Sequence, residues 1–329
     1  MDCDRRALLS ALLAAMWVPG CARGAIPAGG WEAFAANFLQ PDGRIVDTGN
    51  GQVSHSEGQG YGLILAEAAG DRSAFERIWR WTDEVLSRRD VRLFSWRYDP
   101  TAAQPVGDPN NAADGDLLIA WGLLRAARRW GNAGYAEQSA AIRAAVLSRL
   151  VGRVGPRLVL LPGLEGFVQP GHVTLNPAIY VWPALHAFAA AEGGQAWLPM
   201  IRDGEKLIAD ARFGPASLPT DWVDVLTDGT VRPAVGKPAY FGFDAIRVPL
   251  YLAWAGRRAA LQPFSAFWSS YVSRGRPIPA WVDVTDGAVA PYALSDGGMA
   301  VVDVTLGHHP RIASGDYYST ALGALARLA

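Results

Sequence analysis

One pattern dominates the sequence after residue 26: apolar residues recur three and four positions apart in one segment after another, and Gly- and Pro-rich loops separate the segments. This spacing is typical of amphipathic helices. Nothing alternates strand with helix, which disfavours a doubly wound sheet or a β/α barrel. The expected helices cover residues 31–39, 57–69, 73–87, 114–130, 134–151, 177–192, 195–211, 244–256, 262–273 and 316–328.

Two of the helix starts carry additional signals. Ser56 and Gln59 have the spacing of a capping box, and Asn176 is a cap residue placed before a proline at the first helical position. Residues 157–161 could form one strand of a small hairpin. The longer loops are expected at 92–112, 157–175, 212–242 and 274–296.

The number and continuity of the helices bound the architecture. Roughly ten to twelve helices without a linker or low-complexity break predict a single all-α domain over residues 26–329. A stack of helical pairs and a closed double ring both fit, and the lack of a fixed repeat period disfavours an ordinary solenoid. In a closed ring the loops at one end converge on a central cleft, and these loops are long enough to build one.

The first 25 residues are typical of an export signal. Arg5 and Arg6 precede an apolar stretch at 7–18, and small residues follow around Cys21. The arginine pair is also a weak twin-arginine signal, and the Val-Pro-Gly-Cys stretch that ends at Cys21 fits a lipobox, so the type of signal stays open. We expect a periplasmic or secreted protein, with a lipoprotein anchored through Cys21 in the outer membrane as the alternative.

Charge, hydropathy and cysteine usage exclude several classes of function. Thirty Lys and Arg against 31 Asp and Glu give a formal net charge of −1, so there is no basic excess for nucleic acid. No apolar run reaches the ~18–20 residues of a membrane span. Both cysteines, Cys3 and Cys21, lie in the expected signal, which leaves at most one thiol and excludes cysteine catalysis and Cys-based metal sites.

Other chemistries lack their motifs. There is no G-x-S-x-G elbow, no P-loop, and no metal-ligand spacing among the five histidines, so we expect no metal and no organic cofactor. Carboxylates beside aromatic residues remain, and the chain has 13 Trp. That combination suits acid–base cleavage of sugars, in which one acid protonates the leaving oxygen and one base activates water.

Three carboxylate positions stand in unusual contexts. Glu57 falls in the first turn of an expected helix within Ser-Glu-Gly-Gln-Gly-Tyr-Gly, and Asp114 and Asp116 open another helix. Asp244 precedes Arg247 by three residues, on the same helical face. Each of these carboxylates could equally be a cap or a residue that complements the helix dipole. An adjacent arginine would hold Asp244 ionised, as a base must be.

The three motifs, in this order, resemble glycoside hydrolase family 8. They are Ser-Glu-Gly-Gln-Gly-Tyr-Gly at 56–62, Ala-Asp-Gly-Asp-Leu-Leu-Ile-Ala at 113–120 and Phe-Asp-Ala-Ile-Arg-Val-Pro at 243–249. The nearest branch is that of the endoglucanases associated with bacterial cellulose synthase complexes, and the resemblance spans most of residues 30–325. It implies an (α/α)6 barrel, inverting hydrolysis of β-1,4-glucan (cellulose) chains, and a cellulose synthase complex as a further partner.

The resemblance also implies roles for individual residues. Glu57 would be the general acid, Asp244 the general base, and Asp114 would hold the sugar at the cleavage point with Asp116 beside it. The residues implied to bind glucose units are Trp96, Tyr180, Arg247 and Tyr61. Three further aromatic residues are candidates for the cleft and equally for the core, namely Trp182, Trp222 and Trp281.

The sequence departs from the family pattern at two positions. Ala113 stands where Ser or Thr is usual, which removes a hydroxyl next to Asp114, and Gly122 stands where Ser or Ala is common. Neither change touches the implied acid or base, so activity is expected, and only its level is in question.

The proposed acid has a physical requirement of its own. A helix N-terminus favours the charged form of a carboxylate, whereas a general acid must carry a proton. We therefore expect Glu57 to be largely buried and close to another carboxylate such as Asp114. The alternatives that stay open are a hydrolase of chitosan or xylan, an inert glucan-binding scaffold protein, and an α/α barrel with unrelated lyase chemistry.

Overall fold

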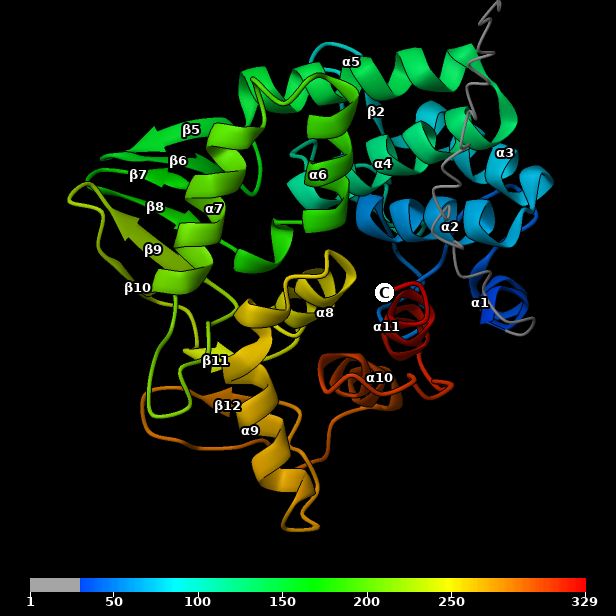
Figure 1. Cartoon of the computed structure of the whole chain (residues 1–329). Coiled ribbons are helices and arrows are strands. Elements are labelled where there is room, and N and C mark those ends of the chain that lie inside the picture. Colours follow the sequence, from blue (N-terminus) through cyan, green and yellow to red (C-terminus); the bar gives the residue numbers. More distant parts are fainter. Residues whose placement is uncertain (1–29) are drawn as a thin grey trace, which may run out of the picture.

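The computed structural model describes residues 30–329 (Figure 1). The expected export signal at 1–25, with Cys3 and Cys21, lies outside the described residues. The α-helices are α1 (Gly30–Phe38), α2 (Ser56–Ala69), α3 (Arg72–Trp81), α4 (Ala113–Trp130), α5 (Ala133–Arg149), α6 (Trp182–Ala191), α7 (Leu198–Asp210), α8 (Arg247–Trp254), α9 (Gln262–Val272), α10 (Asp296–Thr305) and α11 (Tyr317–Ala326).

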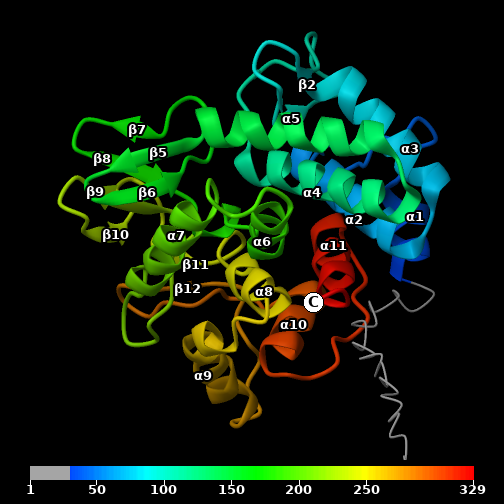
Figure 2. The same cartoon turned by 45° about the horizontal axis from the view of Figure 1, so that its top comes forward.

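Six of these helices close a ring. Helices α2, α4, α6, α8, α10 and α11 each pack against the next, and α11 packs back against α2. Most residues of α2, α4 and α11 are buried, as an inner helix requires. Helices α1, α3, α5, α7 and α9 bury a single stripe and lie around the outside (Figure 2). The expected (α/α)6 barrel, a double ring rather than an open stack, is confirmed.

Close packing of α2 on α4 fixes the part of the ring that carries two of the site motifs. Gly60 of α2 faces α4 so closely that a Cβ there would stand 2.5 Å from the Cβ of Leu118. The two helices make one of the tightest contacts in the described chain, and their first turns lie side by side. This contact brings the first turn of α2, with Glu57, next to that of α4, with Asp114.

Short strands occupy the connections between the helices. An antiparallel sheet has the order β10-β9-β8-β7, from Val231–Pro233, Val223–Leu226, His172–Leu175 and Val168–Gln169. A hairpin pairs β5 (Val151–Val154) with β6 (Arg157–Leu160). The two-residue pairs are β1 (Ser54–His55) with β4 (Arg97–Tyr98), β2 (Ser87–Arg88) with β3 (Leu93–Phe94), and β11 (Tyr240–Phe241) with β12 (Val282–Asp283).

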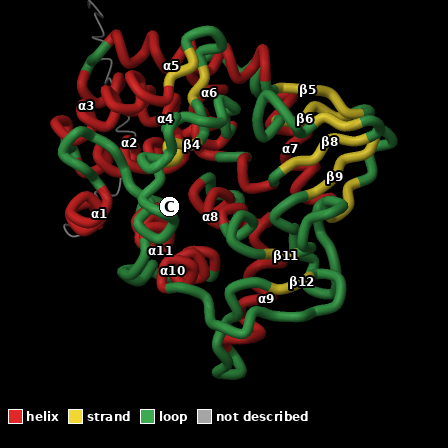
Figure 3. The backbone as a smooth tube through the Cα atoms, turned by 180° about the vertical axis from the view of Figure 1, so that it is seen from behind, coloured by secondary structure: helices red, strands yellow, loops and turns green. Residues whose placement is uncertain are grey.

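The sheet corrects part of the sequence analysis. The hairpin strand expected at 157–161 is present, but the segments 157–175 and 212–242 are not irregular loops, because they contain β7 to β10. Strands of two to four residues are too short to show an alternating pattern. Figure 3 shows β5, β6, β8 and β9 gathered on one side of the barrel. There β8 ends beside Asn176 and β9 begins after Trp222, so the sheet sets the position of both side chains.

Several helix boundaries also differ from expectation. Helix α10 was not expected, and the helix predicted at 177–192 is split into a 3-10 turn at Pro177–Ile179 and α6. The helix predicted at 73–87 continues after Trp81 as a π-helix over Thr82–Leu86. The cap at Asn176 is confirmed, since its side chain accepts a hydrogen bond from the N–H of Ala178.

The capping box at Ser56 was wrong. The Ser56 hydroxyl is buried and makes no hydrogen bond with any described residue. Gln59 turns instead into the core, where it accepts a bond from the N–H of Ile45 (2.6 Å) and donates one to the hydroxyl of Thr82 (2.8 Å). The spacing of the two residues fits a capping box. Gln59 instead makes hydrogen bonds with buried groups that are distant in sequence, so the capping box does not form. Among residues 30–329, no helix has both the length and the apolar character to cross a membrane.

Candidate active site

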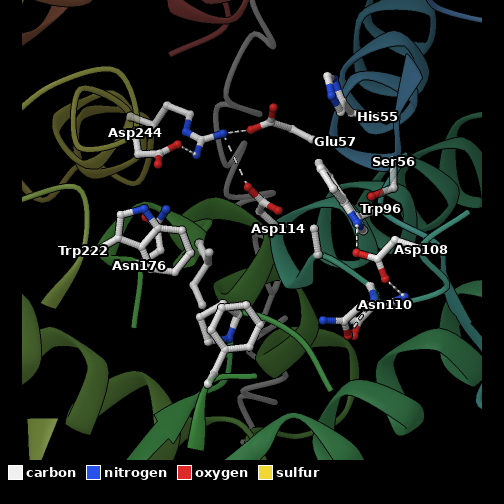
Figure 4. A pocket seen from close by; sticks show the side chains of 16 residues that line it. His55, Ser56, Glu57, Trp96, Asp108, Asn110, Asp114, Asn176, Trp222 and Asp244 are labelled. Atoms are coloured by element: carbon white, nitrogen blue, oxygen red, sulfur yellow. Dashed lines mark hydrogen bonds and ion pairs between the residues drawn. The ribbon is translucent and has the colours of Figure 1, made fainter. Parts of the chain in front are cut away.

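A pocket of about 430 Å³ lies where the first turns of the inner helices meet the sheet and the long loop after β4 (Figure 4). Its wall combines carboxylates with aromatic rings. The lining residues are His55, Ser56, Glu57, Trp96, Asp108, Asn110, Asn111, Ala112, Asp114, Pro162, Phe167, Asn176, Ile179, Trp222, Asp244 and Arg247.

Arg247 gathers the three carboxylates that the sequence motifs supply. Its Nη1 contacts the carboxylates of Glu57 and Asp114, the latter at 3.4 Å, and its Nη2 contacts Asp244 at 2.8 Å. The guanidinium is almost fully buried at the start of α8, and Figure 4 shows the three acids that it contacts, Glu57, Asp114 and Asp244. Motifs from α2, α4 and the turn before α8 are therefore brought together at one charge, and one cation faces three anions.

Glu57 meets the expectation set for it. It lies in the first turn of α2, its side chain is 18% exposed, and it shares Arg247 with Asp114. Tyr61, one helical turn further on, donates a hydrogen bond to Glu57 Oε1 at 2.8 Å. Tyr61 was expected to bind substrate, but its side chain is completely buried and does not line the pocket. It contacts the expected acid instead.

Asp114 projects from the first turn of α4 and is buried, with 10% of its side chain exposed. Burial raises the pKa of Asp114 to about 6, and the hydrogen bond from the backbone N–H of Gly115 opposes this rise. Asp114 also shares the Arg247 cation with Glu57, since both carboxylates contact its Nη1.

Asp244 lies in the turn before α8 rather than inside a helix. It receives side-chain hydrogen bonds from Asn176 and Trp222, both of which line the pocket. Burial, together with the charges of Asp221 and Asp114, raises the pKa of Asp244 to about 7. The expected contact with Arg247 is present, but it does not keep the pKa of Asp244 low, as an arginine that holds Asp244 ionised would, because burial and the other carboxylates outweigh it. A pKa near neutrality suits a general base.

Sequence analysis missed Asp221. This residue accepts hydrogen bonds from the backbone N–H groups of Gly242, Asp244 and Ala245, so it holds the turn that carries the expected base. Burial raises the pKa of Asp221 to about 6, against the effect of these three bonds. No local pattern could have revealed it, since its partners lie more than twenty positions away in a different loop.

Two aromatic walls line the pocket. Trp96, expected in the cleft, stacks on His55 (centroids 5.9 Å apart, 16°), and its Nε1 donates to Asp108 at 2.8 Å. Trp222 stacks on Phe167 (5.9 Å, 1°). Flat faces of this kind fit the CH-rich faces of sugar rings, and the adjacent Asp and Asn side chains can take the hydroxyls.

Tyr180 and Trp182 are core residues, contrary to the expectation that Tyr180 would lie in the cleft. Tyr180 is 1% exposed, its hydroxyl accepts a bond from the N–H of Leu160, and it stacks on Trp182. Trp281 also lies outside the pocket and stacks on Tyr240. Long aromatic side chains near a motif have the same sequence signature whether they turn toward the cleft or away from it.

Asp116 does not lie in the cleft beside the sugar, as expected, but in the core. It is fully buried and accepts hydrogen bonds from the N–H of Phe94 (2.9 Å) and the amide of Asn111 (2.6 Å). Asn111 lines the pocket, so Asp116 supports the wall without touching the cavity. Within the described part of the chain, no cluster of His, Cys, Asp and Glu is arranged to hold a metal ion.

Comparison with known proteins places this geometry in a wider context. The model of the family described as glycosyl hydrolases family 8 matches residues 4–329. An endoglucanase of Cellulomonas uda is 45% identical over 278 residues, covering 84% of this chain and 77% of that protein. A probable endoglucanase of Novacetimonas hansenii is 41% identical over 312 residues, covering 91% and 89%.

Solved structures agree with these matches. The endo-β-1,4-glucanase from Acetobacter xylinum superposes with a TM-score of 0.88 at 40% identity, covering 92% of this chain and 97% of that one. A family 8 endo-β-1,4-glucanase from an Achatina fulica gut metagenomic library gives 0.88 at 44% identity, covering 90% and 95%. A reducing-end-xylose releasing exo-oligoxylanase, at 17% identity and a TM-score of 0.75, shares the fold alone.

Proposed function

Because the chain belongs to glycosyl hydrolase family 8, we propose that it cleaves internal β-1,4 bonds of glucan chains and inverts the anomeric carbon. The observation that carries this proposal is the grouping of Glu57, Asp114 and Asp244 around Arg247 in an aromatic-walled pocket. The similarity to endoglucanases at 40–45% identity supports glucan as the substrate.

In the proposed reaction, Glu57 donates its proton to the glycosidic oxygen while Asp244 removes a proton from a water molecule on the opposite face of the sugar. An inverting pair stands about 6.5–9.5 Å apart, so that the water fits between base and sugar. Glu57 and Asp244 contact different terminal nitrogens of one guanidinium, so they lie across it rather than against each other. This arrangement supports single displacement, and Asp114, which contacts the same guanidinium, would hold the sugar at the cleavage point.

The charge and burial of the cluster also affect the protonation of the two aspartates beside Glu57. One guanidinium cannot neutralise three carboxylates, and burial raises the pKa values of Asp114 and Asp244 to about 6 and 7. Near neutral pH these two aspartates therefore bind more protons than they would in water. A sugar oxygen that enters between Arg247 and Glu57 would release Glu57 from the cation and favour its protonated form.

The test is release of reducing sugar from carboxymethylcellulose, chitosan and xylan by the purified protein, with Glu57→Gln and Asp244→Asn as variants. Both substitutions preserve size and remove the titrating group. We expect cleavage of carboxymethylcellulose and at least a ~10³-fold loss of kcat in each variant, because residues that act as a unit fail together.

Other outcomes would select other functions. Cleavage of chitosan or xylan in place of carboxymethylcellulose would keep the acid–base pair and change the substrate. Binding to cellulose without cleavage of any of the three would identify an inert glucan-binding scaffold. Full activity in either variant would contradict the assignment of that residue.

Two further proposals concern where the enzyme works. We propose export directed by residues 1–25 and action beside a cellulose synthase complex; both rest on the sequence pattern and on the resemblance of the motifs. Fractionation of cells that express the full chain tests the first proposal, since the protein would be found in the periplasm, the medium or the outer membrane. Co-purification with a tagged synthase tests the second, and recovery of the glucanase in the flow-through alone would contradict it.

A further inference from the structure

The side chain of Asp221 closes the turn that carries Asp244. Its Oδ1 accepts three backbone hydrogen bonds, from Gly242 (3.1 Å), Asp244 (3.1 Å) and Ala245 (2.7 Å). Asp221 is itself tied to the same segment, because its own N–H donates to the carbonyl of Tyr240 at 2.7 Å. The turn therefore has one acceptor for three of its N–H groups, and loss of that acceptor would leave three donors unpaired.

Gly242 makes the approach of this carboxylate feasible. A Cβ at position 242 would stand 2.8 Å from Asp221 Oδ2, which is closer than two such atoms approach in folded proteins. The absence of a side chain at Gly242 lets the carboxylate reach the backbone of the turn. Position 242, within Tyr-Phe-Gly-Phe-Asp at 240–244, therefore requires glycine, and the sequence motif alone does not reveal this requirement.

Residues 221 and 222 hold Asp244 from two directions. Asp221 binds the backbone N–H of Asp244, and the Trp222 side chain hydrogen-bonds to the Asp244 carboxyl. Asn176 supplies a second side-chain hydrogen bond to the same carboxyl. Both the position of the Asp244 backbone and the direction of its carboxyl are therefore fixed by the loop before β9 and by the end of β8.

We propose that Asp221 is a positioning residue for the reaction, which fixes the turn that aims Asp244 and acts on the charge state of that carboxyl. The inference rests on the proposed role of Asp244 as the base. A displacement of about 1 Å at a reacting group can cost ~10²-fold in rate, so a loosened turn would lower kcat more than it weakens substrate binding.

The charged and titratable groups that face Asp244 define the expected pH effect. They are Arg247, Asp221, Asp114 and Tyr318, and Glu57 lies across Arg247. The charges of Asp221 and Asp114 raise the pKa of Asp244, in addition to burial. Removal of the Asp221 charge therefore lowers the pKa of Asp244, so the base would remain ionised to lower pH.

The experiment compares Asp221→Asn with Asp221→Ala by kcat, KM and the pH profile of kcat/KM on carboxymethylcellulose. Asparagine keeps an Oδ1 acceptor for the three N–H groups and removes the charge, whereas alanine removes both. We expect Asp221→Ala to lose ~10²-fold in kcat with little change in KM. Asp221→Asn should recover most of that loss, and its acidic limb should move to lower pH. Asp228→Asn, an exposed change in the β9–β10 turn, should alter neither.

Three results would overturn the inference. They are an unchanged kcat in Asp221→Ala, an acidic limb in Asp221→Asn that coincides with that of the unmodified protein, and equal losses in the two variants. Gly242→Ala is the second test if either variant fails to fold, because the added methyl would push Asp221 from the turn; it should lower kcat and spare KM, and full activity would contradict the proposal. Asp244→Asn distinguishes failure of the proposed base from failure of the Asp221 inference. An active Asp244→Asn variant would refute both the role of Asp244 as the base and the positioning role of Asp221. If that variant is inactive, the Asp221 variants decide whether the inference holds.

Discussion

Arg247 is the residue on which the site converges, since its two terminal nitrogens reach three carboxylates from three segments of the chain. A lysine would keep the charge but offer a single nitrogen in place of the planar fork. We expect Arg247→Lys to lower kcat/KM by at least ~10²-fold, because it leaves buried carboxylates without partners.

Steady-state kinetics on carboxymethylcellulose measure this effect, and Arg232→Lys is the matched control. Arg232 lies on β10 and its guanidinium is 3.6 Å from Asp224, outside the pocket. An Arg247→Lys variant as active as Arg232→Lys would show that the fork geometry is not needed.

The raised pKa of Asp244 predicts a trade-off between activity and stability. In the folded protein the pKa is about 7, against a usual value near 3.8, so the folded state binds more protons than the unfolded chain between these values. The free energy of unfolding therefore falls as pH rises from about 4 to 7. Asp244→Asn removes this loss, and we expect the variant to be more stable than the unmodified protein at pH 8 and not at pH 4.

Urea denaturation at the two pH values measures the difference. A variant that is less stable at pH 8 would contradict the account, since it would mean that the ionised carboxylate stabilises the fold. The variant is inactive in the proposed mechanism, so the gain in stability is obtained at the expense of function.

Among individual residues, the sequence motifs identified the acidic residues that meet in the pocket. They did not predict correctly which neighbouring side chains line the pocket and which lie in the core. Glu57, Asp114 and Asp244 were recognisable because short motifs surround them. Tyr180 and Asp116 sit in equally suggestive contexts and point into the core, since the direction of a side chain depends on the packing of distant helices. Asp221 has no motif, and its function arises only when two loops meet.

The contact between α2 and α4 is the element on which the distance between Glu57 and Asp114 depends. Gly60 lies at that contact, and a Cβ added there would stand 2.5 Å from the Cβ of Leu118. We expect Gly60→Ala to lower the free energy of unfolding by about 1–3 kcal/mol through overpacking, and to lower kcat because the two first turns shift apart.

Chemical denaturation and kinetics test this, with Gly134→Ala as the control. Gly134 is an exposed glycine near the start of α5, so alanine there should change stability by no more than about 0.5 kcal/mol. Equal changes of stability and kcat in the two variants would show that helix propensity, rather than the close approach of α2 and α4, governs the effect of the substitution.

The elements themselves were predictable in proportion to their length. Long periodic segments such as α4 and α5 were located to within one or two residues, whereas of the short strands only the one expected at 157–161 was predicted. Helix α10 was not predicted because its sequence, Asp-Gly-Gly-Met-Ala-Val-Val-Asp-Val-Thr, has two glycines in its first turn. Gly297 fits against α11, where it meets Ser319, and Gly298 fits against Leu294, so that packing rather than propensity makes the segment helical.

The whole molecule depends on closure of the ring at its ends. Helix α11 packs on α10, α2 and α1, and Tyr317 places its ring 6.2 Å from Phe34 and 5.6 Å from Phe38. We expect a chain that ends at residue 310, and so lacks α11, to lose cooperative unfolding and all activity, although Glu57 and Asp244 are both retained.

Thermal unfolding and reducing-sugar assays of this chain give the result. The control lacks only Ala329, which is exposed and follows α11. A shortened chain that still unfolds cooperatively would indicate that the helix pairs form an open stack with local stability.

The architecture was the part that sequence predicted best. Helical periodicity excluded most classes of fold and fitted both a stack and a closed ring; the lack of a fixed repeat period disfavoured an ordinary solenoid, and the motif resemblance then favoured the ring. Closure depends on α10 and on the contact of α11 with α2, and neither leaves a local pattern in the sequence. The prediction of one domain over residues 26–329 stays a prediction, which the unfolding experiment also tests.

The stereochemistry of the first product tests the central claim most directly. Proton NMR of a β-1,4-linked cello-oligosaccharide during the first minutes of hydrolysis distinguishes the two anomers before mutarotation. Direct attack of water activated by Asp244, with Glu57 as the acid, predicts that the α-anomer appears first, and that Glu57→Gln and Asp244→Asn produce neither anomer. Initial release of the β-anomer would contradict single displacement and the roles assigned to both carboxylates.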